Sequence, residues 1–530
     1  MKKTFIATCL IAMGASAQAQ DSFLNDQLVN TSSDVHGSAR FVGMGGAMGA
    51  LGADISTIAW NPAGLGLMRR SDISITAGGA WSAKGIEEEG SGNATVDHLG
   101  LVYAMDFGGD KTQFINFGFS YLKKKDYNNA FYADNNNLNG LSQMNTLVNL
   151  ANHDYGTEYN LAGLAIGYGN QKLSFIPYDD VKKEFKNPYK STENFYTQHT
   201  SGSLQGFEFN ISGNYDDRFY WGITMGLDKL KYRAWSDYTE HAPTPYIELK
   251  DGGYSDGSYS VFNDVAIDGM GFNTKLGFIF RPIEDNPLRV ALVAETPTWY
   301  QLKRSNYYSM GDYYFTNPTA ANRNYKTHYT TKEFESYYEY AVRTPFKFRA
   351  GIGSTVGTSL AWDIDYEFAN YRTTAQGEPQ TYVDDPNSSI FNNVWDKDMN
   401  AVTRANLKPV HNVRAGVEFR PISTIALRAG YNYTSSAYKK DVAFDQVNNM
   451  SNSLDYATST NFMRLGDAHT ICLGLGFRWS NSAYLDMAYK LHAQKGDFYA
   501  FDASSQGGKL APVSTELARH QVTATLGFKF

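Results

Sequence analysis

The 530-residue chain has few cysteines, no long hydrophobic run beyond its first residues and no excess of positive charge. Of its two cysteines only Cys472 lies beyond residue 19, so no intramolecular disulfide can form in that part. No later stretch approaches the roughly 20 apolar residues that a membrane-spanning helix needs. The formal net charge is −7, and this mild acidity gives no indication of a nucleic-acid partner.

No metal motif is evident, and the G-x-S-x-G match at Gly253–Gly257 lies in a Gly-, Ser- and Tyr-rich segment read as a loop, not at the strand-to-helix turn that a nucleophile elbow requires. The ten histidines are scattered, without the H-x-x-x-H or Cys/His spacing typical of a metal site, so we expect neither a metal nor another cofactor. A serine assisted by His411, His469 or His520 would be the enzymatic alternative, since barrel hydrolases exist in membranes. Lone histidines on strands are more often lumen or rim residues, so we predict no catalytic residue and no enzyme.

The first residues, MKKTFIATCLIAMGASAQAQ, have the pattern of a secretory signal peptide. Lys2 and Lys3 precede an uncharged stretch, and the small residues Ala17 and Ala19 follow it. We therefore expect a signal peptide over residues 1–19. Its removal takes away two lysines and no acidic residue, which changes the formal charge from −7 to −9.

Aromatic residues are abundant, with 37 Tyr and 32 Phe, and aromatic residues together make up 15% of the chain. That is a heavy load for a soluble secreted protein. A β-barrel membrane protein carries such residues in girdles at the two water interfaces, and its strands alternate apolar and polar side chains.

Alternating runs of about ten residues do recur. At the C-terminus, one face of the expected strand carries only apolar residues: Val522, Ala524, Leu526, Phe528 and Phe530. The same alternation occurs at 346–353, 412–420 and 471–479, with the charged residues on the second face. One face suits lipid and the other suits water.

The census predicts fourteen strands, near 72–81, 96–107, 112–123, 204–214, 218–231, 268–281, 287–299, 343–354, 358–371, 410–420, 423–435, 468–480, 483–497 and 517–530. Short connections alternate with long polar loops at 124–203, 232–267, 300–342, 372–409 and 436–467. An outer-membrane barrel has short turns at one end and long loops at the other, whereas a soluble sandwich shows no such separation of loop lengths. We predict an all-β, 14-stranded antiparallel transmembrane β-barrel over residues 71–530, in the outer membrane of a Gram-negative bacterium.

Two partners follow from a barrel of this kind. Its outer face would contact outer-membrane lipids. The terminal Phe530, which closes an alternating strand, is similar to the signal by which the barrel assembly machinery recognises its substrates.

Residues 20–70 precede the first strand and lack its alternation. The segment Phe41–Ala53 is small and apolar, which disordered segments are not, and fourteen strands enclose more space than wall side chains can fill. We therefore expect residues 20–70 to form an N-terminal hatch, or plug, in the lumen.

A resemblance then becomes specific. The run SARFVGMGGAMGALGADISTIAWNPAGL, Ser38–Leu65, resembles the hatch of the FadL/TodX family of outer-membrane transporters for long-chain fatty acids and other hydrophobic compounds. Asn61, Pro62 and Ala63 match the family's Asn-Pro-Ala element. The resemblance implies outer-membrane transport of a hydrophobic small molecule, with release sideways into the membrane, although the sequence assigns no wall kink for that exit.

No ATP-binding motif or energy-coupling segment is evident, so we expect passive diffusion. Related barrels with similar hatch turns belong to a protein-secretion system. The alternative is therefore a barrel component that acts as a scaffold or shuttle for secreted proteins.

The candidate ligand path consists of apolar hatch residues and the Asn-Pro-Ala turn: Phe41, Met44, Met48, Leu51, Asn61, Pro62 and Ala63. Three cations, Arg349, Arg414 and Arg428, begin the repeated tripeptide Arg-Ala-Gly on the expected lumen face. They could pair with lumen carboxylates such as Glu418 and leave the glycines where the plug packs. They could instead contact an anionic head group, because a desolvated cation binds a carboxylate strongly.

Overall fold

The computed structural model describes residues 34–82, 93–109, 111, 114–153, 178–179, 181–182, 184–186, 189–248, 254–310, 313–315, 328–329, 333–379, 393–440, 462–503 and 506–530. Its helices are α3 (Ala39–Gly43), η3 (Ile55–Ala59), η4 (Pro62–Leu67), α4 (Gln143–His153), η5 (Tyr371–Thr373) and α6 (Lys397–Asn406). Among the residues described, no helix is long and apolar enough to cross a membrane.

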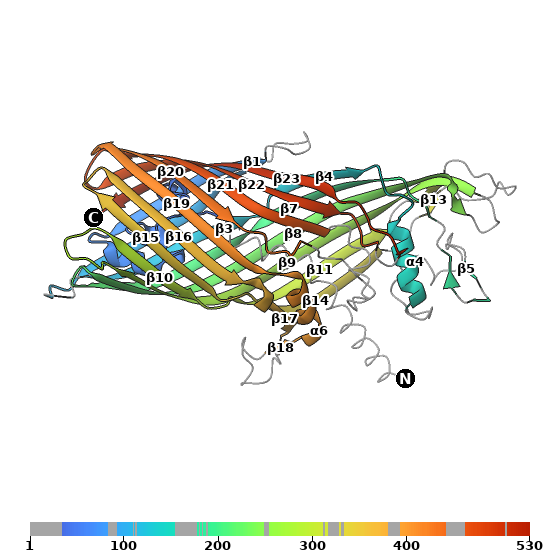
Figure 1. Cartoon of the computed structure of the whole chain (residues 1–530), viewed down its shortest axis with the longest axis horizontal. Helices are drawn as coiled ribbons and strands as arrows, with labels where there is room; N and C mark the ends of the chain where they lie inside the picture. The colour runs from blue at the N-terminus through green and yellow to red at the C-terminus, as the bar shows by residue number, and fades with distance from the viewer. Residues whose placement is uncertain are drawn as a thin grey trace.

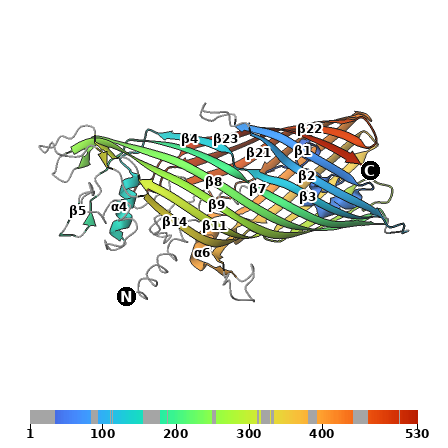
Figure 2. The same cartoon turned by 180° about the vertical axis from the view of Figure 1, so that it is seen from behind.

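Fourteen strands form one closed antiparallel barrel (Figures 1 and 2). In order around the wall they are β1 (Asp72–Ser82), β2 (Asn93–Asp106), β3 (Phe114–Asp126), β7 (Glu193–Tyr215), β8 (Phe219–Glu248), β9 (Tyr254–Phe280), β10 (Arg289–Glu295), β15 (Lys347–Val356), β16 (Leu360–Asn370), β19 (Pro409–Ile422), β20 (Ile425–Thr434), β21 (Phe462–Arg478), β22 (Ala483–Tyr499) and β23 (Val513–Lys529). The last strand pairs with the first, from Asp72↔Lys529 to Ser82↔Arg519, and so closes the barrel.

Shorter strands continue the wall or decorate one end of it. They are β4 (Asn129–Asn135), β5 (Tyr178–Asp179), β6 (Glu184–Phe185), β11 (Trp299–Met310), β12 (Tyr313–Phe315), β13 (His328–Tyr329), β14 (Glu333–Arg343), β17 (Ala375–Glu378) and β18 (Val394–Trp395).

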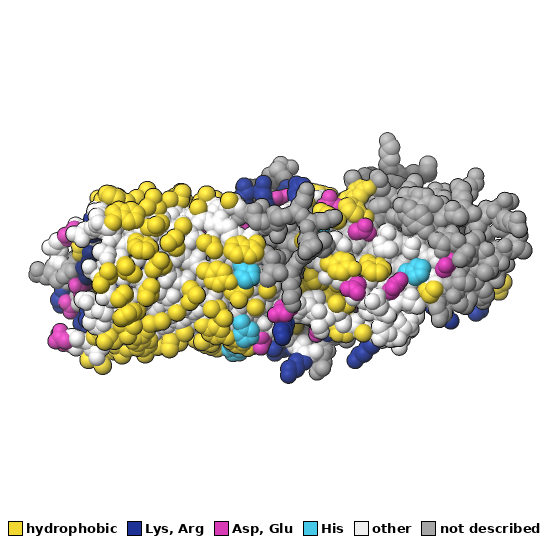
Figure 3. All heavy atoms as spheres, turned by 90° about the horizontal axis from the view of Figure 1, so that it is seen from above, with side chains coloured by type: hydrophobic (Ala, Val, Ile, Leu, Met, Phe, Trp, Pro, Cys, Tyr) yellow, Lys and Arg dark blue, Asp and Glu magenta, His cyan; other side chains and the backbone are white. Residues whose placement is uncertain are grey.

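The side chains of the wall are distributed inside out compared with a soluble protein. On β1, Ile73 and Ile75 are 46% and 45% exposed, whereas the intervening Ser74 is buried. Hydrophobic side chains cover the outside of one half of the barrel (Figure 3). Since burying polar groups and exposing apolar ones is unfavourable in water, this outer face is built for lipid. The prediction of a 14-stranded outer-membrane barrel is confirmed.

Three strands are much longer than predicted. β7, β8 and β9 have 23, 30 and 27 residues, so the expected loops at 124–203 and 232–267 are wrong in part. Alternation continues beyond the lipid-facing belt, with Tyr232 and Tyr238 buried and Arg233 exposed. There the inward residues pack on each other, and the outward ones meet water instead of lipid.

The predicted signal peptide, residues 1–19, and residues 20–33 of the predicted hatch lie outside the described residues. The described part of the hatch, residues 34–70, lies inside the barrel at the end that carries the short turns. Figure 1 shows it in blue beside the C-terminus, whereas α4 and β5 lie at the opposite end. The short helical turns of the hatch contact β3, β7, β8, β9, β20, β21 and β22. A plug in the lumen was part of the predicted fold, and the structure confirms it.

Several wall strands are interrupted in the part of the chain that the structure describes. The third strand of the barrel breaks between β3 and β4 at Tyr127–Asn128, and the seventh breaks between β10 and β11 at Thr296–Thr298. Its neighbour breaks between β14 and β15 at Thr344–Phe346. The last two breaks contain Pro297 and Pro345, which lack the N–H that a sheet requires.

Candidate functional site: the hatch and the lumen above it

Side-chain caps hold the turns of the hatch together. Ser38 caps α3 by accepting a hydrogen bond from the Phe41 N–H (3.1 Å), and its hydroxyl donates to Asp54 (2.8 Å). Asp54 in turn caps η3 by accepting from the Ser56 N–H (2.9 Å). Two helical turns sixteen residues apart are therefore joined through one buried Ser–Asp contact.

Asn61 connects the Asn-Pro-Ala turn to the glycine-rich segment. Its Oδ1 accepts a hydrogen bond from the Ala63 N–H (3.1 Å), and its Nδ2 donates to the Gly49 carbonyl (2.6 Å). Pro62 occupies the first turn of η4, where its missing N–H is not needed. The fully buried Asn61 side chain thus joins two parts of the hatch.

Glycines of the wall admit the hatch. A Cβ added at Gly277 would lie 2.1 Å from Asn61 Oδ1, and one at Gly222 would lie 2.4 Å from the Pro62 carbonyl oxygen. On the other side of the lumen, Cβ atoms at Gly416 and Gly430 would lie 2.3 Å from the Met44 carbonyl oxygen and 2.1 Å from the Gly45 nitrogen. The hatch backbone therefore packs directly against the wall backbone.

Two carboxylates of β16 bind the hatch backbone. Asp363 accepts hydrogen bonds from the N–H groups of Ala50 (3.0 Å) and Leu51 (2.7 Å). Asp365 accepts from the Gly49 N–H (2.8 Å) and from Trp60 Nε1 (2.9 Å). Neither aspartate was among the predicted site residues. Their signal was present, because acidic residues alternate along the inward face of a predicted strand.

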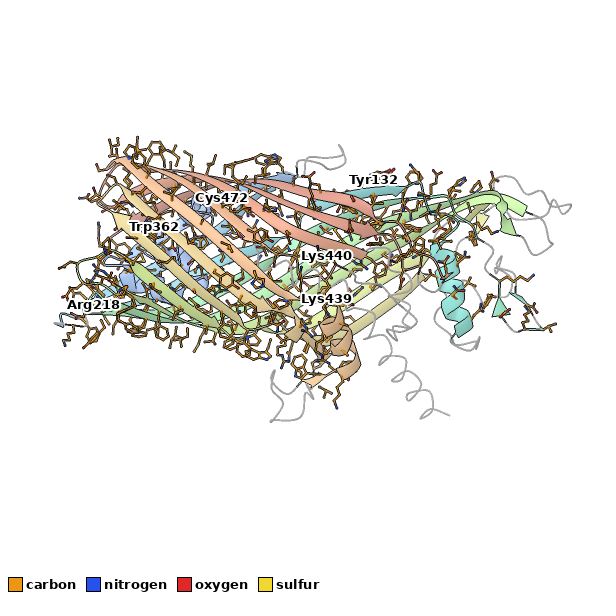
Figure 4. All side chains as sticks on the ribbon, in the orientation of Figure 1. Tyr132, Arg218, Trp362, Lys439, Lys440 and Cys472 are labelled. Carbon is orange, nitrogen blue, oxygen red and sulfur yellow. The ribbon has the colours of Figure 1, made fainter. Side chains whose placement is uncertain are left out.

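The apolar hatch residues proposed for the ligand path are packed rather than open to the lumen. Phe41, Met44, Met48 and Leu51 are at most 4% exposed and form one cluster with Trp60, Cys472 and Ala488. Figure 4 marks Cys472 on the wall. Ala63 belongs to a second cluster, with Ala50, Tyr220, Ile279 and Ala291.

Two of the three predicted cations are neutralised by carboxylates. Arg349 binds Glu295 (2.5 Å) and Glu367 (2.6 Å). Arg428 binds Glu418 (2.7 Å) and Asp486 (2.6 Å). The glycines of the two tripeptides lie close to the hatch or to a wall residue that binds it: Gly430 adjoins Gly45 of the hatch, and Gly351 adjoins Asp365 of β16.

Arg414 is held differently. It stacks on the Trp60 ring, with 3.5 Å between its guanidinium carbon and the ring centroid. Arg349 lies 4.3 Å from the same centroid. Trp60, on the hatch, is therefore contacted by two wall cations, and such contacts are favourable when they are desolvated. The three arginines do not converge on one open site.

Next to the hatch, buried charges line the lumen. Lys124 binds Glu208 (2.7 Å) and Asp228 (2.6 Å), and Lys275 also binds Glu208 (2.9 Å). The Tyr300 hydroxyl donates to Asp228 (2.9 Å) and so joins this network to the next layer of the lumen.

That next layer is apolar. It consists of inward-facing side chains from the third to the eighth strands of the barrel: Tyr127, Leu204, Leu230, Tyr232, Ala234, Val265, Ile267, Tyr300, Leu302, Tyr340 and Val342. We call this set the lumenal apolar cluster. It was not predicted, because nine of its eleven residues come from segments that were read as loops.

The wall interruptions adjoin this cluster but differ in how they are closed. At Pro297 and Pro345, threonines replace the missing ladder bonds: the Thr274 N–H donates to Thr296 Oγ1 (3.0 Å), and the Thr298 N–H donates to Thr344 Oγ1 (2.8 Å). That part of the wall remains continuously hydrogen-bonded.

At the break after β3, side-chain ion pairs connect the strands. The β2–β3 register ends at His98↔Leu122, although β2 continues to pair with β1 as far as Asn93. Beyond that point, Lys123 Nζ lies 3.1 Å from Asp97 Oδ1 and 2.9 Å from Asp126 Oδ2. The adjoining residue, Tyr127, belongs to the lumenal apolar cluster.

The strand histidines named as enzyme candidates bind tyrosines. Nδ1 of His411, His469 and His520 lies 2.7, 2.7 and 2.6 Å from the hydroxyls of Tyr366, Tyr431 and Tyr489. Over the described part of the chain, no three His, Cys, Asp or Glu side chains are grouped to hold a metal ion.

Comparison with known proteins gives structural neighbours only. No family model matches the chain, and no curated protein matches it. A Pseudomonas aeruginosa FadL homologue is 11% identical, with 94% of this chain and 99% of that chain covered, and a TM-score of 0.49. The Ralstonia pickettii toluene transporter TbuX is 12% identical (93% and 98% covered, TM-score 0.46), and the P. putida toluene transporter TodX is 10% identical (94% and 99% covered, TM-score 0.46).

Proposed function

We propose that the chain is a passive outer-membrane channel for hydrophobic small molecules, long-chain fatty acids among them. The lumenal apolar cluster carries this proposal. The interior of such barrels is ordinarily polar, whereas here eleven buried apolar or tyrosine side chains gather on one side of the lumen. These side chains pack on one another and are at most 9% exposed, so together they form an apolar lining that a hydrophobic molecule can enter without separating buried polar groups.

The hatch determines the route of such a molecule. It is tied to the wall by backbone hydrogen bonds to Asp363 and Asp365 and by the fit at the wall glycines. A path through the hatch would break many of these contacts together. We propose that the molecule leaves through the wall instead, as the resemblance implies.

The break after β3 suits this exit better than the proline breaks. Its edges are bridged by the side chains of Lys123 on β3 and Asp97 on β2, which can rotate apart without disturbing a backbone ladder. Tyr127 leads from the lumenal apolar cluster to this break. Opening the proline breaks would instead separate backbone N–H groups from their threonine acceptors and so disturb the hydrogen-bonded ladder of the wall itself.

The test uses neighbouring residues on opposite faces of β8. Leu230 is buried in the lumenal apolar cluster, whereas the adjacent Lys229 is exposed on the outside. A deletion strain would be complemented with wild type, Leu230→Gln or Lys229→Gln, and uptake of radiolabelled oleate and toluene would be measured. Because an amide without a partner in an apolar site costs about 1–3 kcal/mol, we expect Leu230→Gln to lower uptake about tenfold. Lys229→Gln should behave as wild type.

The secretion alternative gives a different result in the same strains. If deletion stops the export of secreted proteins while uptake of both compounds remains normal, the transport proposal is wrong and the scaffold reading is correct. Equal uptake by the Leu230→Gln and wild-type strains would remove the lumenal apolar cluster from the path.

A further inference from the structure

A recess at the short-turn end of the barrel has not been assigned a role. Its volume is about 670 Å³, and it is bounded by the turns after β15, β19 and β21 and by the end of β23. Outer-membrane barrels place their short turns in the periplasm. We call this recess the periplasmic vestibule.

The vestibule is lined by cations. Arg420, Arg478 and Lys529 contribute to it, and none of the described lining residues is Asp or Glu. Because side chains alternate along a strand, Arg420 faces the same side as the buried Glu418, and Lys529 the same side as the buried Thr525. These cations therefore lie at the mouth of the lumen and do not face lipid.

The carboxylates nearest to the vestibule already have partners. Glu418 is bound by Arg40 (3.0 Å), Arg420 (2.6 Å) and Arg428 (2.7 Å), so three cations share one carboxylate. Asp72 lies 3.8 Å from Lys529 and accepts a hydrogen bond from the Tyr484 hydroxyl (3.1 Å).

Positive charge is in excess around the vestibule. Arg70 donates to the backbone carbonyls of Asn481 and Lys529 at 2.8 Å each, and these neutral partners leave its charge uncompensated. The side chain of Arg478 has no hydrogen bond or ion pair to any part of the chain that the structure describes. Of the three cations that line the vestibule, Arg420 pairs with Glu418 and Lys529 lies 3.8 Å from Asp72, which leaves Arg478 without a carboxylate partner among the described residues.

The rim of the vestibule is apolar. Trp479 and Ile422 line it and are 60% and 54% exposed. Trp479 directly follows β21 and is largely exposed, so it lies at the edge where the wall meets the short turns, the level at which aromatic residues of such barrels meet the periplasmic leaflet. An anionic head and an apolar tail therefore find complementary surfaces within one recess.

We propose that the periplasmic vestibule binds the anionic head group, carboxylate or phosphate, of a lipid-like molecule. This inference rests on the proposed function only for the source of the bound molecule. If the chain transports acids, the molecule can be a transported acid; otherwise it is a phospholipid of the membrane. A guanidinium is suited to both head groups, because it can donate two parallel hydrogen bonds.

Trp479 supplies the assay. Purified full-length protein in nonionic detergent would be titrated with 9,10-dibromostearate, whose bromines quench a nearby tryptophan. Comparison with Trp479→Phe isolates the signal of this residue. We expect saturable quenching of Trp479 by the acid, at least tenfold weaker quenching by its methyl ester, and a similar weakening in Arg478→Gln combined with Lys529→Gln.

The matched control is Arg218→Gln. Arg218 lies at the same end of the barrel (Figure 4) but pairs with Glu284 outside the vestibule (3.7 Å). Each variant is first checked for the heat-dependent mobility of a closed barrel. If the double variant does not assemble, Arg478→Gln alone carries the test, since its side chain has no described contact to lose.

Competition identifies the source of the head group. If phosphatidylglycerol displaces dibromostearate and inorganic phosphate does not, the site takes a membrane lipid; if neither displaces it, the site takes the carboxylic acid. Equal quenching by acid and ester, or unchanged quenching in the vestibule variants, would overturn the proposal. The quenching assay uses purified protein, so its result does not depend on uptake by cells. If the deletion strain took up oleate and toluene normally, only the proposed function would be refuted.

Discussion

Replacing Asn61 and Pro62 together with alanine should release the hatch without unfolding the barrel. Asn61→Ala leaves two buried groups, the Gly49 carbonyl and the Ala63 N–H, without the partners they have in the wild type. Each such group costs about 1–3 kcal/mol, so the hatch loses at least about 2 kcal/mol. Pro62→Ala adds about 0.4–1 kcal/mol by making the displaced chain more flexible.

A loss of about 2 kcal/mol raises the population of the displaced hatch about 30-fold, because 1.4 kcal/mol corresponds to a factor of ten. Single-channel conductance in planar bilayers measures this population as the fraction of time spent open. The wall is held by its own interstrand hydrogen bonds, so the heat-dependent mobility shift should remain.

The control for this variant is Asn286→Ala. Asn286 accepts a hydrogen bond from the Leu288 N–H (2.9 Å) in the short turn between β9 and β10, away from the hatch. Its replacement should leave the fraction of time that the channel is open at the wild-type value. Wild-type conductance in the Asn61/Pro62 variant would refute the reasoning, since it would show that the turn is only a linker.

Three further predictions concern the fit of the hatch and the far end of the barrel. Gly277→Val should prevent the hatch from seating, because even a Cβ would lie 2.1 Å from Asn61 Oδ1; limited proteolysis should then cut the hatch in assembled barrels, and an uncut hatch would contradict this. Asp365→Ala removes acceptors for Gly49 N–H and Trp60 Nε1, so it should raise conductance, whereas alanine at the exposed Asp264 should not. Beyond the lipid-facing belt, burial raises the pKa of Glu240 above the usual glutamate value, although Ser191, Tyr238 and the Gln143 N–H donate to it. Since the folded state holds this proton more tightly, the start of α4 should lose stability as pH rises through the raised pKa. The protection factors of the α4 amides, which are the intrinsic exchange rates divided by the observed rates at the same pH, should therefore fall from acidic to neutral pH in wild type and not in Glu240→Gln.

The sequence predicted the membrane-embedded wall well for a physical reason. Lipid on one side and a polar lumen on the other force strict alternation, which can be read without a partner strand. Beyond the lipid-facing belt this constraint ends, so the Tyr- and Asn-rich extensions of β7, β8 and β9 looked like loops. The proline breaks had a local signal, because Pro297 falls inside the predicted strand 287–299.

The candidate site was less predictable, because it depends on contacts across the barrel. Asn61 could be assigned to the hatch from its turn, but its acceptor at Gly49 depends on how the hatch folds. The partners of Arg349, namely Glu295 and Glu367, come from two other strands. Sequence alone therefore could not decide which cations are neutralised.

The most direct test of the proposed channel is a crystal structure of the protein with oleate added at saturation. The account predicts elongated density along the lumenal apolar cluster, in contact with Ile267, Tyr300 and Leu302. Density confined to the outer, lipid-facing surface, with the lumenal apolar cluster covered only by protein side chains, would contradict it.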